Sequence, residues 1–207
     1  MRSLTRTVIA VVAASIATAG LVAPAQAASA KPGASCAMSG MVMTAKNLTY
    51  VCQKDAMGKA VWSQGLKPGK APLTIKDGWA KAADTGMSGA FGVIMNPTTK
   101  PITVIGATSP YAKAIQTHET VMKNGAMVMS EKPGGFVIPA KGSFELKPGG
   151  NHLMFMGITK PIKAGALVPL TLITKDGSTV TVKVMAKPYV GANETYDPNA
   201  STGMSMG

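Results

Sequence analysis

The sequence predicts an all-β protein, a Greek-key β-sandwich, and three observations support this. Between residues 73 and 185, short apolar runs rich in Val, Ile, Thr and Phe recur roughly every 8–12 residues. Pro, Gly, Asn and Asp separate these runs, and no long run has the 3.6-residue period of an amphipathic helix. The pair Asp176-Gly177 lies between two alternating β-branched runs, which is the strongest local signal of a β-hairpin.

The first 27 residues have the features of a secretory signal peptide. Arg2 and Arg6 supply a positive region, residues 8–22 are apolar, and Ala25-Gln26-Ala27 is a typical cleavage sequence. We expect cleavage after Ala27 and export of a soluble chain to the periplasm, the cell envelope or the extracellular space. No Cys lies at this boundary, so the sequence does not suggest a lipid anchor. We expect no membrane span in the mature form, because no later apolar run approaches ~18 residues.

Residues 28–70 form a separate segment that contains both cysteines of the chain. Cys36 and Cys52 are predicted to form a disulfide, as expected for an exported protein. Closing a loop of this size with a disulfide stabilises the folded state by about 3 kcal/mol. Residues 48–52 and 59–62 are predicted strands, so we expect a small β-hairpin held by the disulfide. The Gly- and Pro-rich residues 65–72 are expected to be a linker.

Residues 71–188 should form the sandwich. Its predicted strands are residues 73–75, 78–80, 90–95, 102–105, 114–121, 126–129, 136–138, 143–146, 152–156, 167–174 and 179–185. After Pro188 the chain becomes polar, and residues 189–207 are expected to be a disordered, Met-containing tail.

Composition and the absence of known motifs argue against two broad classes of function. The net charge is +12, but both arginines lie in the signal peptide, and the lysines are scattered through turns without interleaved aromatic residues. A nucleic-acid surface would need arginine or aromatic stacking platforms, so we expect no nucleic-acid binding. The chain lacks a nucleophile elbow, a P-loop, a dinucleotide-binding fingerprint and a zinc-protease motif. We therefore expect that the protein is not an enzyme.

The two histidines lie among methionines. The chain has 15 Met and only 2 His. Methionines follow each histidine: Met122, Met127 and Met129 follow His118, and Met154 and Met156 follow His152. Residues i and i+2 of a strand share a face, so His152 and Met154 should project together. Imidazole with two or three thioethers is a soft, neutral donor set that suits Cu(I) better than Zn²⁺, Mg²⁺ or Ca²⁺. The alternative is that the methionines only fill the core of a structural extracellular sandwich.

The stretch from about Lys76 to Met185 resembles the periplasmic copper chaperones of the PCuAC type. The resemblance includes TGMSGAFGVIMNPT, IQTHETVMKNGAMVM, NHLMFMGI and VPLTLITKDGSTVTVKV. Family members carry His-x10-Met and, about 21 residues later, His-x-Met. His118 and Met129 match the first element, and His152 and Met154 match the second. The interval here is 22 residues, and we place the extra residue in the turn at residues 132–135.

This resemblance implies a cupredoxin-like β-sandwich that binds one Cu(I) through His118, Met129, His152 and Met154. Met127 and Met156 are second-choice ligands, and the sequence leaves open whether Cu(II) also binds. It implies delivery of copper to an acceptor, such as subunit II of cytochrome c oxidase or another copper chaperone. A copper buffer for resistance is an alternative. Electron transfer is disfavoured because a blue-copper site needs a Cys ligand beside the histidines.

Further methionines lie outside the predicted sandwich. They are Met38, Met41, Met43 and Met57 in the N-terminal segment and Met204 and Met206 in the tail. One hypothesis is that they form auxiliary weak copper sites. The alternative is that they have no role in metal binding.

Overall fold

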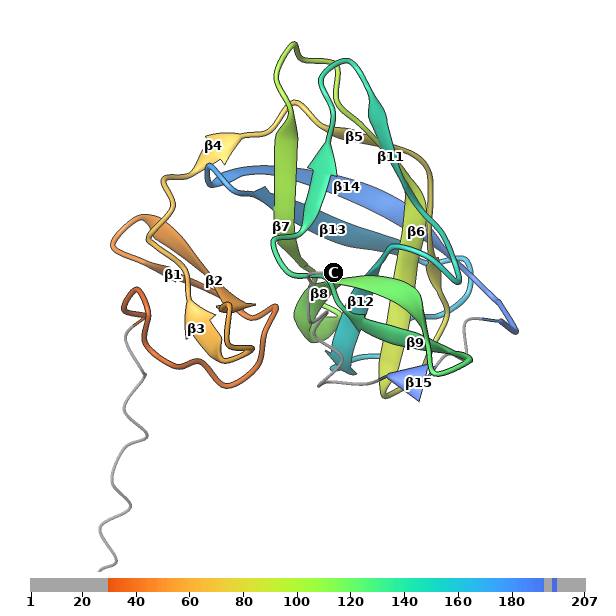
Figure 1. The fold of residues 1–207 in the computed structure, drawn as a ribbon. Coiled ribbons are helices and arrows are strands. Elements are labelled where there is room, and N and C mark those ends of the chain that lie inside the picture. Colours follow the sequence, from red (N-terminus) through yellow and green to blue (C-terminus); the bar gives the residue numbers. More distant parts are fainter. Residues whose placement is uncertain (1–29, 192–194, 197–207) are drawn as a thin grey trace, which may run out of the picture.

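The computed structural model describes residues 30–191 and 195–196 (Figure 1). The expected signal peptide and the two methionines of the expected tail lie outside these residues. In the part of the chain that is described, every regular element is a strand, and no helix could span a membrane. The predicted all-β fold class is therefore confirmed.

The strands follow the predicted order closely. Their bounds are β1 (Val42–Ala45), β2 (Leu48–Lys54), β3 (Ala60–Trp62), β4 (Gly69–Lys70), β5 (Thr74–Lys81), β6 (Met87–Met95), β7 (Ile102–Thr108), β8 (Ala112–Lys123), β9 (Ala126–Glu131), β10 (Phe136–Ile138), β11 (Ser143–Leu146), β12 (His152–Ile158), β13 (Leu167–Thr174), β14 (Ser178–Lys187) and β15 (Thr195–Tyr196). Two predicted strands at 73–75 and 78–80 are one strand, β5, with a register shift between Lys76 and Trp79. The bulge explains why the apolar pattern breaks there.

Strands β1, β2 and β3 form a small antiparallel sheet at the N-terminus, which we call the N-terminal module (residues 30–66). The predicted disulfide between Cys36 and Cys52 is confirmed. Tyr50, Cys52 and Trp62 form the centre of the module. Such a small core benefits from a covalent link, because a sheet of three short strands buries little apolar surface.

The sandwich is one long sheet that folds over on itself. Its strand order is β10-β7-β13-β14-β5-β6-β12-β8-β9-β15, and β7 also pairs with β8 at Ala107 and Ile115. The fold encloses a core that includes Ile115, Leu153, Phe155 and Leu172. The segment between the module and β5 packs on this body, because β4 pairs with β14 and Ala71 is buried.

Strands β13 and β14 form the hairpin predicted from the Asp176-Gly177 pair. Gly177 has a φ of 90°, which glycine adopts without strain. The Asp176 carboxylate accepts hydrogen bonds from Thr174 Oγ1 and from the backbone N–H and Oγ of Ser178. These bonds, led by that from Thr174, hold the pKa of Asp176 below its usual range. The turn is therefore closed by side-chain chemistry as well as by backbone geometry.

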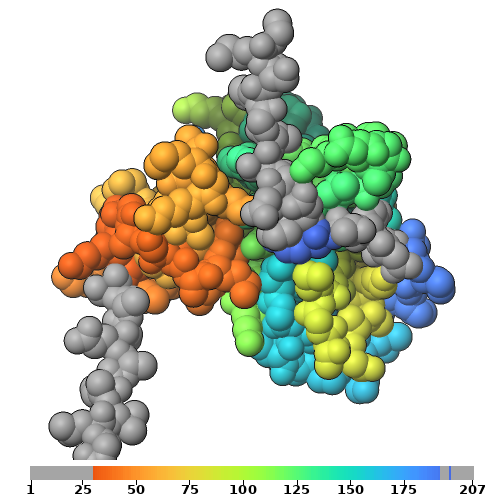
Figure 2. Space-filling model, turned by 60° about the horizontal axis from the view of Figure 1, so that its bottom comes forward, coloured from red at the N-terminus to blue at the C-terminus, as the bar shows by residue number. Residues whose placement is uncertain are grey.

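The N-terminal module packs against the sandwich (Figure 2). Val51 of β2 forms one buried apolar cluster with Ile105 of β7 and Ile173 of β13. The Gln53 side chain donates a hydrogen bond to the Ile105 carbonyl at 3.4 Å. These contacts join β2 of the module to β7 and β13 of the sandwich.

Candidate metal centre

Both histidines lie on the face of β8 and β12 that points away from the sandwich core. His118 and His152 are directly opposite each other in the antiparallel register of these strands. Side chains alternate between the two faces of a strand. Leu153 and Phe155 enter the core, and His152 and Met154 therefore point to the other side. The sequence prediction that His152 and Met154 share a face agrees with this register.

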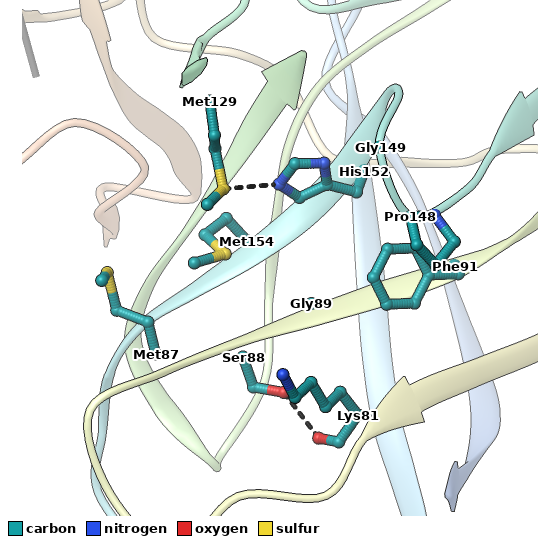
Figure 3. Close-up of a pocket in the computed structure, with 10 residues that line it drawn as sticks. All are labelled: Lys81, Met87, Ser88, Gly89, Phe91, Met129, Pro148, Gly149, His152 and Met154. Carbon is teal, nitrogen blue, oxygen red and sulfur yellow. Dashed lines mark hydrogen bonds between the residues drawn. The ribbon is translucent and has the colours of Figure 1, made fainter. Parts of the chain in front are cut away.

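Met129 reaches the same face from the neighbouring strand. On β9 it lies opposite Thr120, two residues beyond His118 on β8. Its Sδ is 3.1 Å from His152 Nε2 (Figure 3). The His152 Nδ1–H donates to the Gly150 carbonyl at 2.9 Å, so Nε2 is the nitrogen that presents its lone pair towards the sulfur.

Met129 and Met154 belong to one buried cluster with Met156 and Ala114. In Figure 3 the Met129 and Met154 side chains lie next to each other, and the His152 ring is directed at Met129. A small cavity of about 50 Å³ opens between them, lined also by Met87 and Phe91. Two thioethers and an imidazole therefore lie side by side in the wall of this cavity.

His118 is not among the residues that line this cavity. Its side chain is completely buried, and its ring centroid is 5.5 Å from that of His152. Its Nε2 is 2.7 Å from Gln116 Oε1, whereas its Nδ1 is buried without a hydrogen-bond partner among the described residues. The ring of Tyr196 stacks on it at 5.4 Å.

Burial lowers the pKa of His118 to about 3, and repulsion from Lys54 and from the protonated form of His152 adds to this effect. The imidazole is therefore neutral at physiological pH and carries a lone pair on one nitrogen. A buried polar atom without a partner costs about 1–3 kcal/mol. A metal ion bound at Nδ1 would remove that cost.

The two second-choice ligands differ in position. Met156 is buried, lies opposite Ala114 on β8 and Met87 on β6, and is two residues from Met154. Met127 is 42% exposed and lies opposite Met122, farther from the histidines along the β8–β9 hairpin. Residues 132–135, where we placed the extra residue, form a turn.

The additional methionines also differ from one another in position and burial. Met38 and Met41 of the N-terminal module pack against the buried methionine cluster. Met43 packs in the core of the module, and Met57 is 88% exposed. Met204 and Met206 lie outside the described residues.

Sequence reasoning missed three residues around His118, namely Ser39, Gln116 and Tyr196. Gln116 lies two residues before His118, so strand periodicity alone places both on one face. Ser39 and Tyr196 reach this face through contacts between distant segments, for which the local sequence carries no signal. In the described part of the chain, no three His, Cys, Asp or Glu residues gather as a metal site.

A family model described as "LpqE-like: Putative lipoprotein LpqE-like" matches residues 73–186, which is more than half of the chain. The chain belongs to the LpqE-like family. This LpqE-like protein is 46% identical over 131 residues to the putative lipoprotein Lxx21020 of Leifsonia xyli subsp. xyli. The match covers 62% of this chain and 79% of that relative.

Two solved structures are similar to this LpqE-like protein. The copper-bound PCuAC domain from PmoF2 aligns with 58% of this chain and 97% of that domain, at 18% identity and a TM-score of 0.48. The solution structure of apo-DR1885 from Deinococcus radiodurans aligns with 77% of this chain and 93% of that one. Its identity is 25% and its TM-score is 0.44.

Proposed function

We propose that this LpqE-like protein is an exported copper carrier that binds one Cu(I) through His118, His152, Met129 and Met154. The observation that carries the proposal is the contact of His152 Nε2 with Met129 Sδ at 3.1 Å, directly beside a second, neutral imidazole. Two Lewis bases from different strands converge there on one side of a sheet. Met129 is favoured over Met127 because only Met129 makes this contact.

The chemistry of the donors favours Cu(I) over harder ions. Two neutral imidazoles and two thioethers add no negative charge, whereas Mg²⁺ and Ca²⁺ require oxygen ligands. The carboxylate of Glu131 lies on the same face opposite His118, but it accepts a hydrogen bond from Ser39 and pairs with Lys54 at 3.8 Å. We therefore assign it no role as a ligand.

Copper is the cargo of this protein, and release is part of the function. Thioether ligands are weak donors, so an acceptor with thiolates or imidazoles can replace them one at a time. The motif resemblance to the PCuAC type suggests the copper centre of cytochrome c oxidase subunit II as the acceptor. The name of the family and the predicted signal sequence support export.

Cu(I) titration tests the binding site. The mature chain is titrated under anaerobic, reducing conditions against a chromophoric Cu(I) chelator, next to His118→Ala, Met154→Leu and the control Met185→Leu. Met185 is a partly exposed methionine of β14 outside the cluster. We expect one tightly bound Cu(I) in the parent and control. We expect a loss in both site variants larger than the roughly 10–100-fold typical of changes around a metal site. Equal affinity in all four proteins would reject the site.

Copper transfer separates a chaperone from a buffer. The Cu(I)-loaded protein is mixed with the copper-free soluble domain of oxidase subunit II, and the metal on each protein is measured after separation. Transfer faster than the release of copper to a dilute chelator supports a chaperone. Retention of copper, together with poor survival of a deletion strain at high copper, supports a buffer.

A further inference from the structure

The N-terminal module covers the histidine face of β8 through a close backbone approach. The Ile115 N–H donates to the Gly40 carbonyl at 3.3 Å, and the Gln116 side-chain N–H donates to the Ser39 carbonyl at 2.9 Å. Gly40 has a φ of 83°, and a Cβ at this position would lie 2.7 Å from the Ile115 carbonyl oxygen. Only glycine permits both this backbone conformation and this approach.

The Ser39 carbonyl determines the orientation of the Gln116 amide. A carbonyl oxygen only accepts hydrogen bonds, so the NH₂ end of Gln116 must face Ser39. The Oε1 end then faces His118, with 2.7 Å between Oε1 and His118 Nε2. Because Oε1 also only accepts, His118 Nε2 must carry the proton of the neutral ring. The lone pair of His118 is therefore on Nδ1, the buried nitrogen without a hydrogen-bond partner in the described chain.

The same loop is fixed at a second point. The Ser39 hydroxyl donates to Glu131, the residue opposite His118 on β9. The Gly40 N–H donates to the carbonyl of Cys52 at 2.8 Å, and Cys52 is joined by the disulfide to Cys36. The loop that orients Gln116 is thus held by the disulfide-linked strand and by the strand that carries Met129.

We propose that the N-terminal module, through Ser39 and the positioning residue Gln116, fixes the tautomer of His118 and makes Nδ1 its metal-binding nitrogen. The assignment of Nδ1 as a metal-binding nitrogen rests on the proposed function. The tautomer itself is a property of the metal-free protein. The two histidines then bind through different atoms, His118 through Nδ1 and His152 through Nε2.

The tautomers are read directly by long-range ¹H–¹⁵N correlation spectra of the metal-free mature chain with ¹⁵N-labelled histidine. We expect His118 protonated on Nε2 and His152 protonated on Nδ1. A His118 protonated on Nδ1 would overturn the proposal, whatever the variants do. This readout needs no copper, so its failure is distinct from failure of the proposed function, which the titration of the parent detects.

Three variants test the role of the module. Gln116→Leu removes the acceptor, so we expect a mixture of His118 tautomers and a loss of roughly 10–100-fold in Cu(I) affinity. Gln116→Glu keeps an acceptor oxygen and should retain the Nε2–H tautomer. Gly40→Ala would place a Cβ 2.7 Å from the Ile115 carbonyl oxygen and 2.8 Å from Gln116 Cγ, so it should displace the loop and the Gln116 amide and change the His118 spectrum without replacing either residue.

Gln53→Leu is the matched control. It removes another glutamine at the same interface, whose amide bonds Ile105 and does not contact His118. We expect an unchanged His118 tautomer and unchanged Cu(I) affinity in this control. The proposal is wrong if Gln116→Leu keeps both the tautomer and the affinity, or if Gln53→Leu changes them equally. Thermal unfolding of each variant verifies the fold, and the spectrum of the parent decides the tautomer even if one variant does not fold.

Discussion

His118 and His152 lie opposite each other across β8 and β12, with their ring centroids 5.5 Å apart. Neighbouring strands of a sheet hold such cross-strand pairs at a fixed separation, so the two rings need no flexible loop to meet. Met154 lies on β12, and Met129 lies on β9, on the other side of β8. The candidate site is thus held by three adjacent strands of one sheet.

The choice between Met129 and Met127 can be tested by matched substitutions. Leucine conserves the volume of methionine and removes the sulfur. We expect Met129→Leu to weaken Cu(I) binding strongly and Met127→Leu to leave it nearly unchanged, because Met127 is partly exposed and Met129 contacts His152. Competition with a chromophoric chelator measures both. A larger effect from Met127→Leu would reverse the assignment.

The buried, neutral His118 predicts a pH dependence of stability in the metal-free protein. Its pKa is about 3 in the folded chain against an ordinary value of 6.5, so the unfolded state binds the proton first as the pH falls. The free energy of unfolding should therefore decrease from about pH 6.5 towards pH 3, by up to about 1.4 kcal/mol per pH unit. Urea unfolding at several pH values measures this. In His118→Leu we expect a shallower slope over the same range, and an unchanged slope would contradict the assignment.

Asp176 contributes to the pH dependence of stability in the same direction as His118, but at lower pH. Its pKa is lowered in the folded turn, so its stabilisation is complete above the unfolded value of 3.8 and is lost as the pH falls through the folded value. Asp176→Asn should destabilise by about 1 kcal/mol at pH 7. The difference from the parent should shrink below about pH 3.8. Urea midpoints of the two proteins at pH 7 and pH 3 provide the comparison.

Removal of the disulfide should affect stability and copper binding together. The double variant Cys36→Ala, Cys52→Ala should lose about 2–4 kcal/mol of stability. Because Gly40 and Ser39 depend on the Cys52 strand, we also expect weaker Cu(I) binding at temperatures where the sandwich remains folded. Cu(I) titration measures the affinity, and near-UV circular dichroism of the same sample verifies that the sandwich is folded. Together the two measurements separate the effect on copper binding from the effect on stability. Full Cu(I) affinity in the double variant would show that the module does not support the site.

Tyr196 covers His118 and packs against the methionine cluster. Tyr196→Ala should therefore expose the histidine and accelerate the transfer of Cu(I) to a chelator, with a smaller effect on equilibrium affinity. Stopped-flow transfer kinetics measure the rate. Tyr189→Ala is the control, because Tyr189 contacts Trp79 and lies 40% exposed. Equal rates in the parent and both variants would argue against a covering role.

The sequence predicted most of the fold and part of the site. Period-2 patterning identified the strands and the shared face of His152 and Met154, since both properties are local. The cross-strand position of His118 and the reach of Met129 are long-range, and only the motif resemblance suggested them. The burial of His118 was not predictable, because its cover comes from Gln116 bonded to Ser39 and from Tyr196. These contacts join segments that are far apart in the chain.

Under the proposed function, the bond between the Gly40 N–H and the Cys52 carbonyl would link copper loading to the cellular compartment. Disulfides form in oxidising compartments and are rare in the cytosol. A newly made chain in the cytosol lacks the covalent link that holds the loop over β8. We therefore expect the loop, and with it the orientation of the Gln116 amide beside His118, to be held less firmly in that chain. Oxidation after translocation would then act as a maturation step, so that the protein becomes competent for copper only at its destination.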